Sequence, residues 1–398
     1  MSGGGWKHGF IVLLAGYVLV YIHRIVTGVL KPEFSVIALK YGWDPTIFMS
    51  LSSSAYFYAY AAMQLPGGVF ADALGMKKYA ALSLALITGG TALMILEIPT
   101  AVIIGRLLIG GGAAAVFICI QRFIGIRLTH SLGGRATGTA LMVGNIGALL
   151  ATSPSRYAVN VMGFHLYLIM LGSLTAIVGI LSYINLKDRG MEGIRVTESL
   201  KKIFIQLSQV VRNTHSLALA YTLATTYATV VAFQSFWGHE YYTQVFGADE
   251  NASANYLLMV AMSFIVSTLI AGWITDKVIG RRKPVLILNS ILHFVSWAVM
   301  LLPIYYPLRP SQVFGLGASI LLGFAAGFHI VIPPMARELY KKEFSGTTFA
   351  FVNLAGFIAI AIYQSLGVAV AIGGIIALFT LLSLLSIAAS ILTKETLT

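Results

Sequence analysis

Charged residues are scarce in this chain of 398 residues, since Asp, Glu, Lys and Arg make up 10% of it, against about 25% in a typical soluble protein. Hydrophobic residues make up 58%. Such a composition cannot cover a water-facing surface, so we expect a lipid bilayer to be the solvent. The net charge of +12 then reports membrane topology. No basic amphipathic or aromatic-interleaved patch accompanies it, so nucleic-acid binding is not expected.

Cysteine is nearly absent as well. The single residue, Cys119, lies inside an apolar run, which excludes an intrachain disulfide. The sequence also lacks Cys/His metal spacing, a phosphate-binding loop followed by Lys-Ser/Thr, and a nucleophile elbow. We therefore expect no enzyme activity, no metal and no cofactor. The first apolar run has no small-residue cleavage site followed by a soluble domain, so we interpret it as a first helix, not a removable signal.

The chain does contain twelve apolar runs, and a spanning helix needs about 20 such residues. They lie near 10–31, 46–70, 79–97, 100–126, 135–158, 164–186, 215–238, 252–274, 284–303, 310–336, 345–368 and 370–392. With the N-terminus inside, 19 of the 26 Lys and Arg residues fall in inside loops, 4 outside and 3 within helices. The positive-inside rule then places both termini in the cytoplasm. The prediction is an all-α, multi-pass protein of the plasma membrane.

The longest polar connection divides six runs from six. It predicts an N-terminal six-helix bundle at 1–186, a cytoplasmic linker at 187–214 and a C-terminal six-helix bundle at 215–398. An internal repeat supports this division, because Gly138-Thr139 with Asn145 returns after 208 residues as Gly346-Thr347 with Asn353. Two pseudo-symmetric bundles predict a substrate site between them, near mid-membrane.

A second repeat joins glycine, aspartate and basic residues between apolar runs. The first copy comprises Gly68, Asp72, Gly75, Lys77 and Lys78, and the second comprises Gly272, Asp276, Gly280, Arg281, Arg282 and Lys283. The glycines permit a tight turn and a close approach of helices, and the cations belong in the cytoplasm. A carboxylate at the membrane edge needs a cation or the positive N-terminus of a helix as its partner.

These two loops, with aspartates 204 residues apart, resemble the signature Gly-x-Leu-Ala-Asp-Arg-x-Gly-Arg-Arg/Lys of the major facilitator superfamily. Phe70, Ala73 and Met76 depart from the pattern in the first copy. The resemblance implies the twelve-helix fold of a secondary transporter that works by alternating access. It also implies a gating role, in which Asp72 caps a helix near Ser345 and Asp276 caps one near Gly134, each in the opposite half.

Arg24 lies in the first predicted helix, and a guanidinium in a membrane is normally paired or functional. Tyr21, His23 and Arg24, followed by Pro32, resemble the first helix of the organophosphate and anion:cation symporter branches of the family. The run from Tyr56 to Gly67, with Gln64, resembles their second helix. The resemblance implies that Arg24 binds the anionic group of a substrate. The alternative is that Arg24 snorkels to the outer surface or pairs with Glu33.

The seventh predicted helix contains no Lys or Arg, where organophosphate carriers commonly present a second arginine, and Gln234 and His239 are its nearest polar substitutes. One arginine suits a carboxylate better than a doubly charged phosphate, so we predict a small organic anion as substrate. A proton-antiport exporter of drugs or metabolites is an alternative, although Gly144, Gly147 and a late Pro154 replace its Gly-Pro hallmark. A sugar-phosphate or sugar carrier and a non-transporting receptor are further alternatives.

No Asp or Glu falls at mid-membrane in a predicted helix, which disfavours a sodium site. Protons are the expected coupling ion, with His23, Glu33, Arg106 and His329 as candidates. Arg106 resembles a family arginine tied to proton coupling, or it bonds carbonyls structurally. Arg122 is either a second anion contact or an anchor at the membrane surface. The amide side chains of Gln64, Asn145 and Asn353 either line the substrate cavity or form hydrogen bonds between helices. We expect a monomer. The predicted substrate contacts are Arg24, His23, Tyr21, Tyr56, Gln64, Arg122, Asn145, Gln234, His329 and Asn353.

Overall fold

The computed structural model describes residues 5–127, 130–187, 195–306, 310–339 and 342–397, and every regular element within these ranges is a helix. The chain divides into two compact units, Met1–Lys202 and Ile203–Thr398. The division lies inside the linker predicted at 187–214, of which 188–194 lie outside the described residues.

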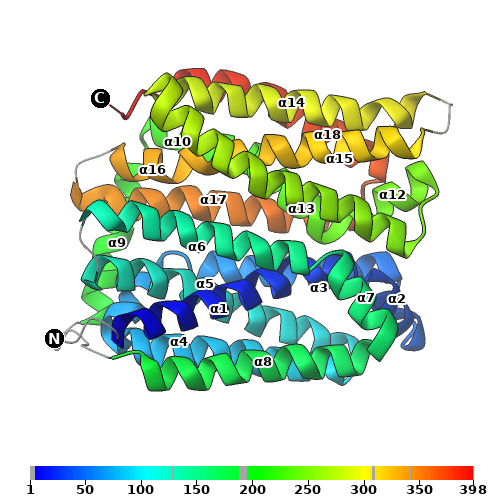
Figure 1. Cartoon of the computed structure of the whole chain (residues 1–398), viewed down its shortest axis with the longest axis horizontal. Coiled ribbons are helices and arrows are strands. Elements are labelled where there is room, and N and C mark those ends of the chain that lie inside the picture. The colour runs from blue at the N-terminus through cyan, green and yellow to red at the C-terminus, as the bar shows by residue number, and fades with distance from the viewer. Residues whose placement is uncertain (1–4, 128–129, 188–194, 307–309, 340–341, 398) are drawn as a thin grey trace. The chain divides into compact units, whose positions relative to one another are not determined.

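The first unit is built from long helices that run the length of the unit (Figure 1). They are α1 (Gly5–Ile25), the 3₁₀ turn η1 (Val26–Gly28), α2 (Lys31–Lys40), α3 (Pro45–Ala62), α4 (Pro66–Ile95), α5 (Pro99–Arg127), α6 (His130–Leu150), α7 (Ser153–Met162), α8 (Phe164–Asn185) and the start of α9 (Val196–Val210). Proline in the first turn begins several of them, where its missing N–H has no helical partner to lose. The short helices α2 and α9 were not predicted from the sequence.

Glycines set the closest helix crossings in the first unit. α5 packs against α3 and α4, and α1 packs against α5, α6 and α8. A Cβ on Gly110 of α5 would come within 2.9 Å of the Cα of Tyr56 on α3, whereas one on Gly111 would meet no described atom within 4 Å. Gly110 therefore permits the close approach of α5 and α3.

The turn glycines of the repeated loop are confirmed in both units. Gly75 interrupts α4 at φ 75° and Gly280 has φ 63°, both conformations that L-residues rarely adopt. A Cβ on Gly68 or Gly272 would meet no described atom within 4 Å, so the close helix approach expected of these glycines stays a prediction.

The second unit repeats the long-helix plan but interrupts its helices more often. Its elements are the rest of α9, α10 (Thr214–Thr225), α11 (Tyr227–Ala232), the π-helix η2 (Phe233–Trp237), α12 (Gly238–Phe246), α13 (Glu250–Trp273), the π-helix η3 (Ile274–Ile279), α14 (Lys283–Tyr305), α15 (Gln312–Gly327), the 3₁₀ turn η4 (Phe328–Val331), α16 (Ile332–Glu338), the 3₁₀ turn η5 (Lys342–Phe344), α17 (Ser345–Ser365), the 3₁₀ turn η6 (Leu366–Val368) and α18 (Ile372–Leu392). Thr226 separates α10 from α11 with φ −108° and ψ −88°.

The described residues contain 10 helices long and apolar enough to cross a membrane, or 11 if α6 and α7, bent by 44°, form one span. The predicted run 46–70 is divided between α3 and the start of α4, and α3 carries the buried serines Ser52, Ser53 and Ser54. With that segment included, the arrangement is consistent with the twelve predicted spans.

Candidate functional site

Arg24 lies within a cage of tyrosines in the first unit. Its guanidinium stands over the rings of Tyr21, at 4.4 Å, and Tyr60, at 5.0 Å, and its Nε donates to the hydroxyl of Tyr56 at 3.5 Å. Arg24 is only 2% exposed, so the snorkelling alternative is wrong. Cation–π contacts of this kind hold a guanidinium without neutralising its charge.

The cage is assembled from α1 and α3, with α6 behind it. A Cβ on Gly144 of α6 would come within 2.8 Å of the rings of both Tyr17 and Tyr21. The glycine therefore leaves the space that these two rings occupy. Tyr17 and Tyr21 meet edge to face at 4.9 Å between centroids. Gln64 bonds the hydroxyl of Tyr60, which brings it to the same cluster.

Arg106 of α5 serves the backbone. Its Nη1 donates to the carbonyl of His23 at 2.6 Å and its Nε to the carbonyl of Ser52 at 3.2 Å, while its guanidinium lies 4.8 Å from the ring centroid of Tyr56. Arg106 is fully buried. The sequence left two roles open for this residue, and the contacts match the structural one, because they tie α1 to α3 beside the Arg24 cage.

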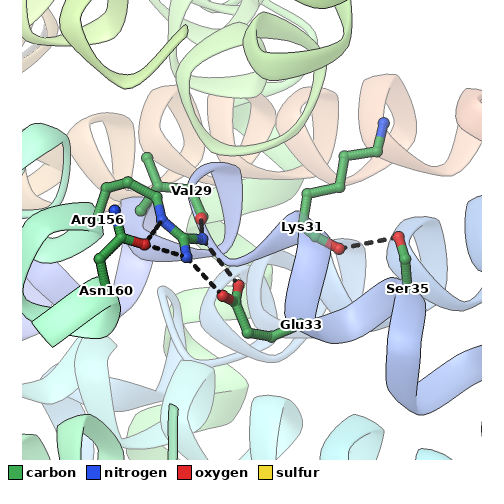
Figure 2. Close-up of polar contacts among 6 residues, drawn as sticks. All are labelled: Val29, Lys31, Glu33, Ser35, Arg156 and Asn160. Atoms are coloured by element: carbon green, nitrogen blue, oxygen red, sulfur yellow. Dashed lines mark hydrogen bonds and ion pairs between the residues drawn. The ribbon is translucent and has the colours of Figure 1, made fainter. Parts of the chain in front are cut away.

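The alternative in which Glu33 pairs with Arg24 is wrong, because Glu33 pairs with Arg156 instead. Figure 2 shows its carboxylate paired with both terminal nitrogens of Arg156, at 2.8 and 3.1 Å. Arg156 also donates to the carbonyl of Val29 at 3.1 Å and to Oδ1 of Asn160 at 2.9 Å from Nε and 2.6 Å from Nη2. This cluster fastens the exit of α1 and the first turn of α2 to α7.

His23 and Asn145 are buried in the same unit. The ring Nε2 of His23 lies 3.3 Å from the hydroxyl of Thr175 on α8. Asn145 of α6 is 4% exposed, and its Oδ1 has no hydrogen-bond partner among the described residues. An unpaired buried acceptor is costly, which keeps Asn145 in the set of predicted contacts.

Asp72 forms an ion pair with Arg122 of α5. The side chain of Arg122 is 10% exposed, so it does not extend outward as an isolated anchor. This pairing, with a partner in the same half as Asp72, was not predicted from the sequence. The expected cap at the helix near Ser345 concerns the other unit and stays a prediction. Asp276 is exposed on η3, and its cap near Gly134 also stays a prediction.

The predicted residues of the second unit do not form one cluster of side-chain bonds. The ring of His329 stacks on Tyr227 with centroids 4.3 Å apart and lies half-buried in η4. Gln234 lies in the π-helix η2 and is 2% exposed, and its Nε2 has no partner among the described residues. Asn353 is half-buried on α17.

Sequence reasoning missed a polar stripe on α14. Asn289, His293 and Trp297 are spaced four residues apart and are all fully buried. Asn289 Nδ2 donates to the hydroxyl of Thr226 at 3.3 Å, and Trp297 Nε1 donates to that of Thr229 at 3.1 Å. The four-residue spacing of polar residues in an apolar run was the available signal, since it places all three on one helix face.

The charge around the Arg24 cage is positive. The helices α1, α3, α5, α6, α7 and α8 contain no Asp or Glu, while α1 and α5 bring Arg24 and Arg106 to the same tyrosine. A guanidinium on aromatic faces in a low-dielectric setting attracts an anion strongly. The arrangement can therefore hold a carboxylate or another small anion at Arg24.

Comparison with known proteins identifies the family of this chain. The model of the Major Facilitator Superfamily matches residues 13–363. A solved structure titled "Crystal structure of D-xylose-proton symporter" is similar over 99% of this chain and 99% of its own, with a TM-score of 0.80 and 13% identity. At that identity the likeness concerns the fold. No curated protein matches the chain.

The repeated aspartate loop and the all-helical fold both agree with this match. Proteins of this family move solutes and are not enzymes. The chain belongs to the Major Facilitator Superfamily and is a multi-pass secondary transporter.

Proposed function

We propose that this protein transports a small organic anion, a carboxylate in preference to a phosphate, across the plasma membrane by alternating access and with proton coupling. Arg24 is the anchor for the anionic group. The observation that carries the proposal is a buried guanidinium held by tyrosine faces, on helices that contain no carboxylate. The distribution of Lys and Arg supports cytoplasmic termini, and the proposed working unit is the monomer.

A guanidinium suits this role because it offers two parallel donors to a carboxylate, which an ammonium cannot. The tyrosine cage fixes the orientation of the Arg24 fork through its 3.5 Å contact with Tyr56, so less side-chain entropy is lost when the anion binds. The seventh predicted helix, now α10 to α12, supplies no cation. A single cation favours one negative charge over the two of a phosphate ester.

A neutral sugar is the second candidate substrate. Two observations favour it: the fold is similar to that of a D-xylose–proton symporter, and Tyr21, Tyr56 and Tyr60 provide aromatic and hydroxyl groups around Arg24. In this case Arg24 would act as a hydrogen-bond donor to hydroxyls, and its charge would matter less.

Proton coupling is supported by the abundance of histidine over carboxylate in the predicted spans. Of the four predicted proton carriers, Arg106 is committed to backbone carbonyls and Glu33 to Arg156. His23 and His329 keep imidazoles that can take up and release a proton. An inward proton gradient should raise accumulation of substrate in vesicles, whereas an exporter working by antiport would show the opposite response and a receptor would show no flux.

Thermal-shift binding on purified protein tests the anchor, with a panel of carboxylates, phosphate esters and neutral sugars. Arg24→Lys should weaken carboxylate binding by roughly tenfold or more, which is about 1.4 kcal/mol per factor of ten, and Arg24→Ala should weaken it further. Arg122→Lys is the matched control, because Arg122 is engaged with Asp72. Full-strength carboxylate binding by a folded Arg24→Ala protein would refute the anion proposal, and exclusive binding of neutral sugars would favour the second candidate.

A further inference from the structure

The polar stripe of α14 lies against the break in the seventh span. Asn289 bonds Thr226, the residue at which α10 ends, and Trp297 bonds Thr229 one turn further along. His293 lies between these two contacts on the same helix face and is fully buried. The break between α10 and α11 is therefore held by α14 on either side of a buried imidazole.

The hydrogen bonds fix which nitrogen of His293 is basic. Its Nδ1 lies 2.8 Å from the carbonyl oxygen of Asn289. A carbonyl oxygen can only accept, so Nδ1 carries the hydrogen and Nε2 carries the lone pair. His329 on η4, which packs against α14, repeats the arrangement, with Nδ1 2.7 Å from the carbonyl oxygen of Ala326. Two neighbouring imidazoles thus keep Nε2 as the proton-accepting atom.

The stripe also contains two acceptors that lack a donor. Nε2 of His293 and Oδ1 of Asn289 are both buried without a hydrogen-bond partner among the described residues. The amide of Asn289 is not simply reversed, because the hydroxyl of Thr226 donates to the carbonyl of Thr222 at 2.6 Å and so accepts from Nδ2. A buried acceptor without a donor is costly, and a proton taken at Nε2 would turn one of these two acceptors into a donor.

We infer that His293 is a buried binding site for one proton, which it takes at Nε2, and that the site controls the break between α10 and α11. Protonation turns the unpaired Nε2 acceptor into a donor. The unpaired Oδ1 of Asn289 is the complementary acceptor on the same face of α14. Because Asn289 also holds Thr226, a changed contact at its amide alters the support of the break. This inference rests on the proposed proton coupling and adds a carrier to it.

The surroundings limit the site to a single proton. His329 interacts electrostatically with His293, and Tyr227 of α11 stacks on His329. α15 and α18, which also pack against α14, contain no Asp, Glu, Lys, Arg or His. On η3, Asp276 and Lys277 lie near the opposite, N-terminal end of α14. Because the described residues of these elements place no carboxylate beside the two imidazoles, both cannot be charged, since like charges in a low dielectric repel strongly.

The test is a titration of the full chain, labelled with ¹⁵N at histidine, in detergent micelles. Long-range ¹H–¹⁵N spectra distinguish the two neutral tautomers and the cation, and His293→Gln assigns the signal. From about pH 8 to about pH 4, spanning the range in which imidazoles titrate, the His293 ring should pass from the Nδ1–H tautomer to the cation. His329→Gln should move the midpoint upward by about one pH unit or more, because it removes the competing charge.

His215→Gln is the matched control, because His215 lies at the exposed start of α10 and its loss should leave the His293 titration unchanged. A His293 ring that stays neutral over the whole range, as it would with only a water bound, overturns the inference. That result would leave the proposed transport intact, since the titration uses no substrate. A titrating His293 in a protein whose flux ignores the proton gradient would instead refute the proposed coupling and leave the proton site in place.

Discussion

The ion pair between Glu33 and Arg156 allows a quantitative prediction. The pair is largely buried, with side-chain exposures of 17% for Glu33 and 7% for Arg156. All three nitrogens of the guanidinium are engaged by Glu33, Val29 and Asn160 (Figure 2). These contacts join Val29, just after η1, and the start of α2 to α7. We expect the cluster to stabilise the first unit and to hold the end of α1 in place.

The magnitude follows from what each substitution leaves behind. Arg156→Gln leaves a buried carboxylate without a cation, and breaking such a pair costs about 3–5 kcal/mol; the 17% exposure of Glu33 favours the lower value. Arg156→Lys keeps the charge but loses the two parallel bonds, so we expect a loss of about 2 kcal/mol. In the double variant Glu33→Gln/Arg156→Gln no charge remains to be desolvated. Its loss should therefore be smaller than the sum of the single losses by about 2 kcal/mol or more.

The assay is a double-mutant cycle on the free energy of unfolding, measured by reversible denaturant titration in mixed micelles. Asn160→Ala is the control, because it removes the acceptor of two Arg156 bonds but keeps the ion pair, and it should cost about 1 kcal/mol. Additive single losses at Glu33 and Arg156 would refute the reasoning. They would show that the bidentate geometry carries no coupling energy.

Two further predictions concern helix packing and pH. Gly110→Ala should lower the melting temperature in detergent, because the new Cβ meets the backbone of Tyr56, whereas Gly111→Ala, with open space around it, should not. At Glu395, burial raises the pKa, but hydrogen bonds from four backbone N–H groups, two of them at the start of α14, lower it by more. The pKa of Glu395 therefore lies below its usual value. Its stabilising effect is present above the unfolded pKa and lost as the pH falls through the lower folded value. Glu395→Gln should therefore reduce the melting temperature at neutral pH and flatten its dependence on acid pH.

Local backbone requirements could be predicted from the sequence because they depend on one residue. Gly75 and Gly280 were expected at turns, and both have positive φ. The repeat of the aspartate loops likewise indicated the family and the all-helical fold, since both follow from the order of residue types along the chain. The close approach expected at Gly68 depends on a neighbouring helix, and among the described atoms none lies within 4 Å of a Cβ built there.

Pairing of side chains could not be predicted in the same way, because it depends on which helix faces meet. Glu33 was considered as a partner of Arg24, but α7 brings Arg156 to it from 123 residues away. His293 was overlooked because its apolar surroundings in sequence match those of an ordinary core residue. Its significance depends on the partners that α11 and η4 supply or fail to supply.

The two units fasten their repeated loops by ion pairs of opposite sense. In the first unit the loop gives the carboxylate of Asp72 and the helix α5 gives Arg122. In the second unit the loop gives Arg282 and the helix α16 gives Glu338. A pair of charges attracts equally when its signs are exchanged, so the second unit keeps a loop-to-helix link without using its own loop aspartate. Asp276 is thereby left exposed and available for a partner outside its loop, whereas Asp72 has Arg122 as a partner in its own unit. We expect Asp276→Asn to change gating more directly than Asp72→Asn does. The Asp72→Asn change also removes the carboxylate that pairs with Arg122 on α5, so its effect on gating is mixed with the loss of that ion pair.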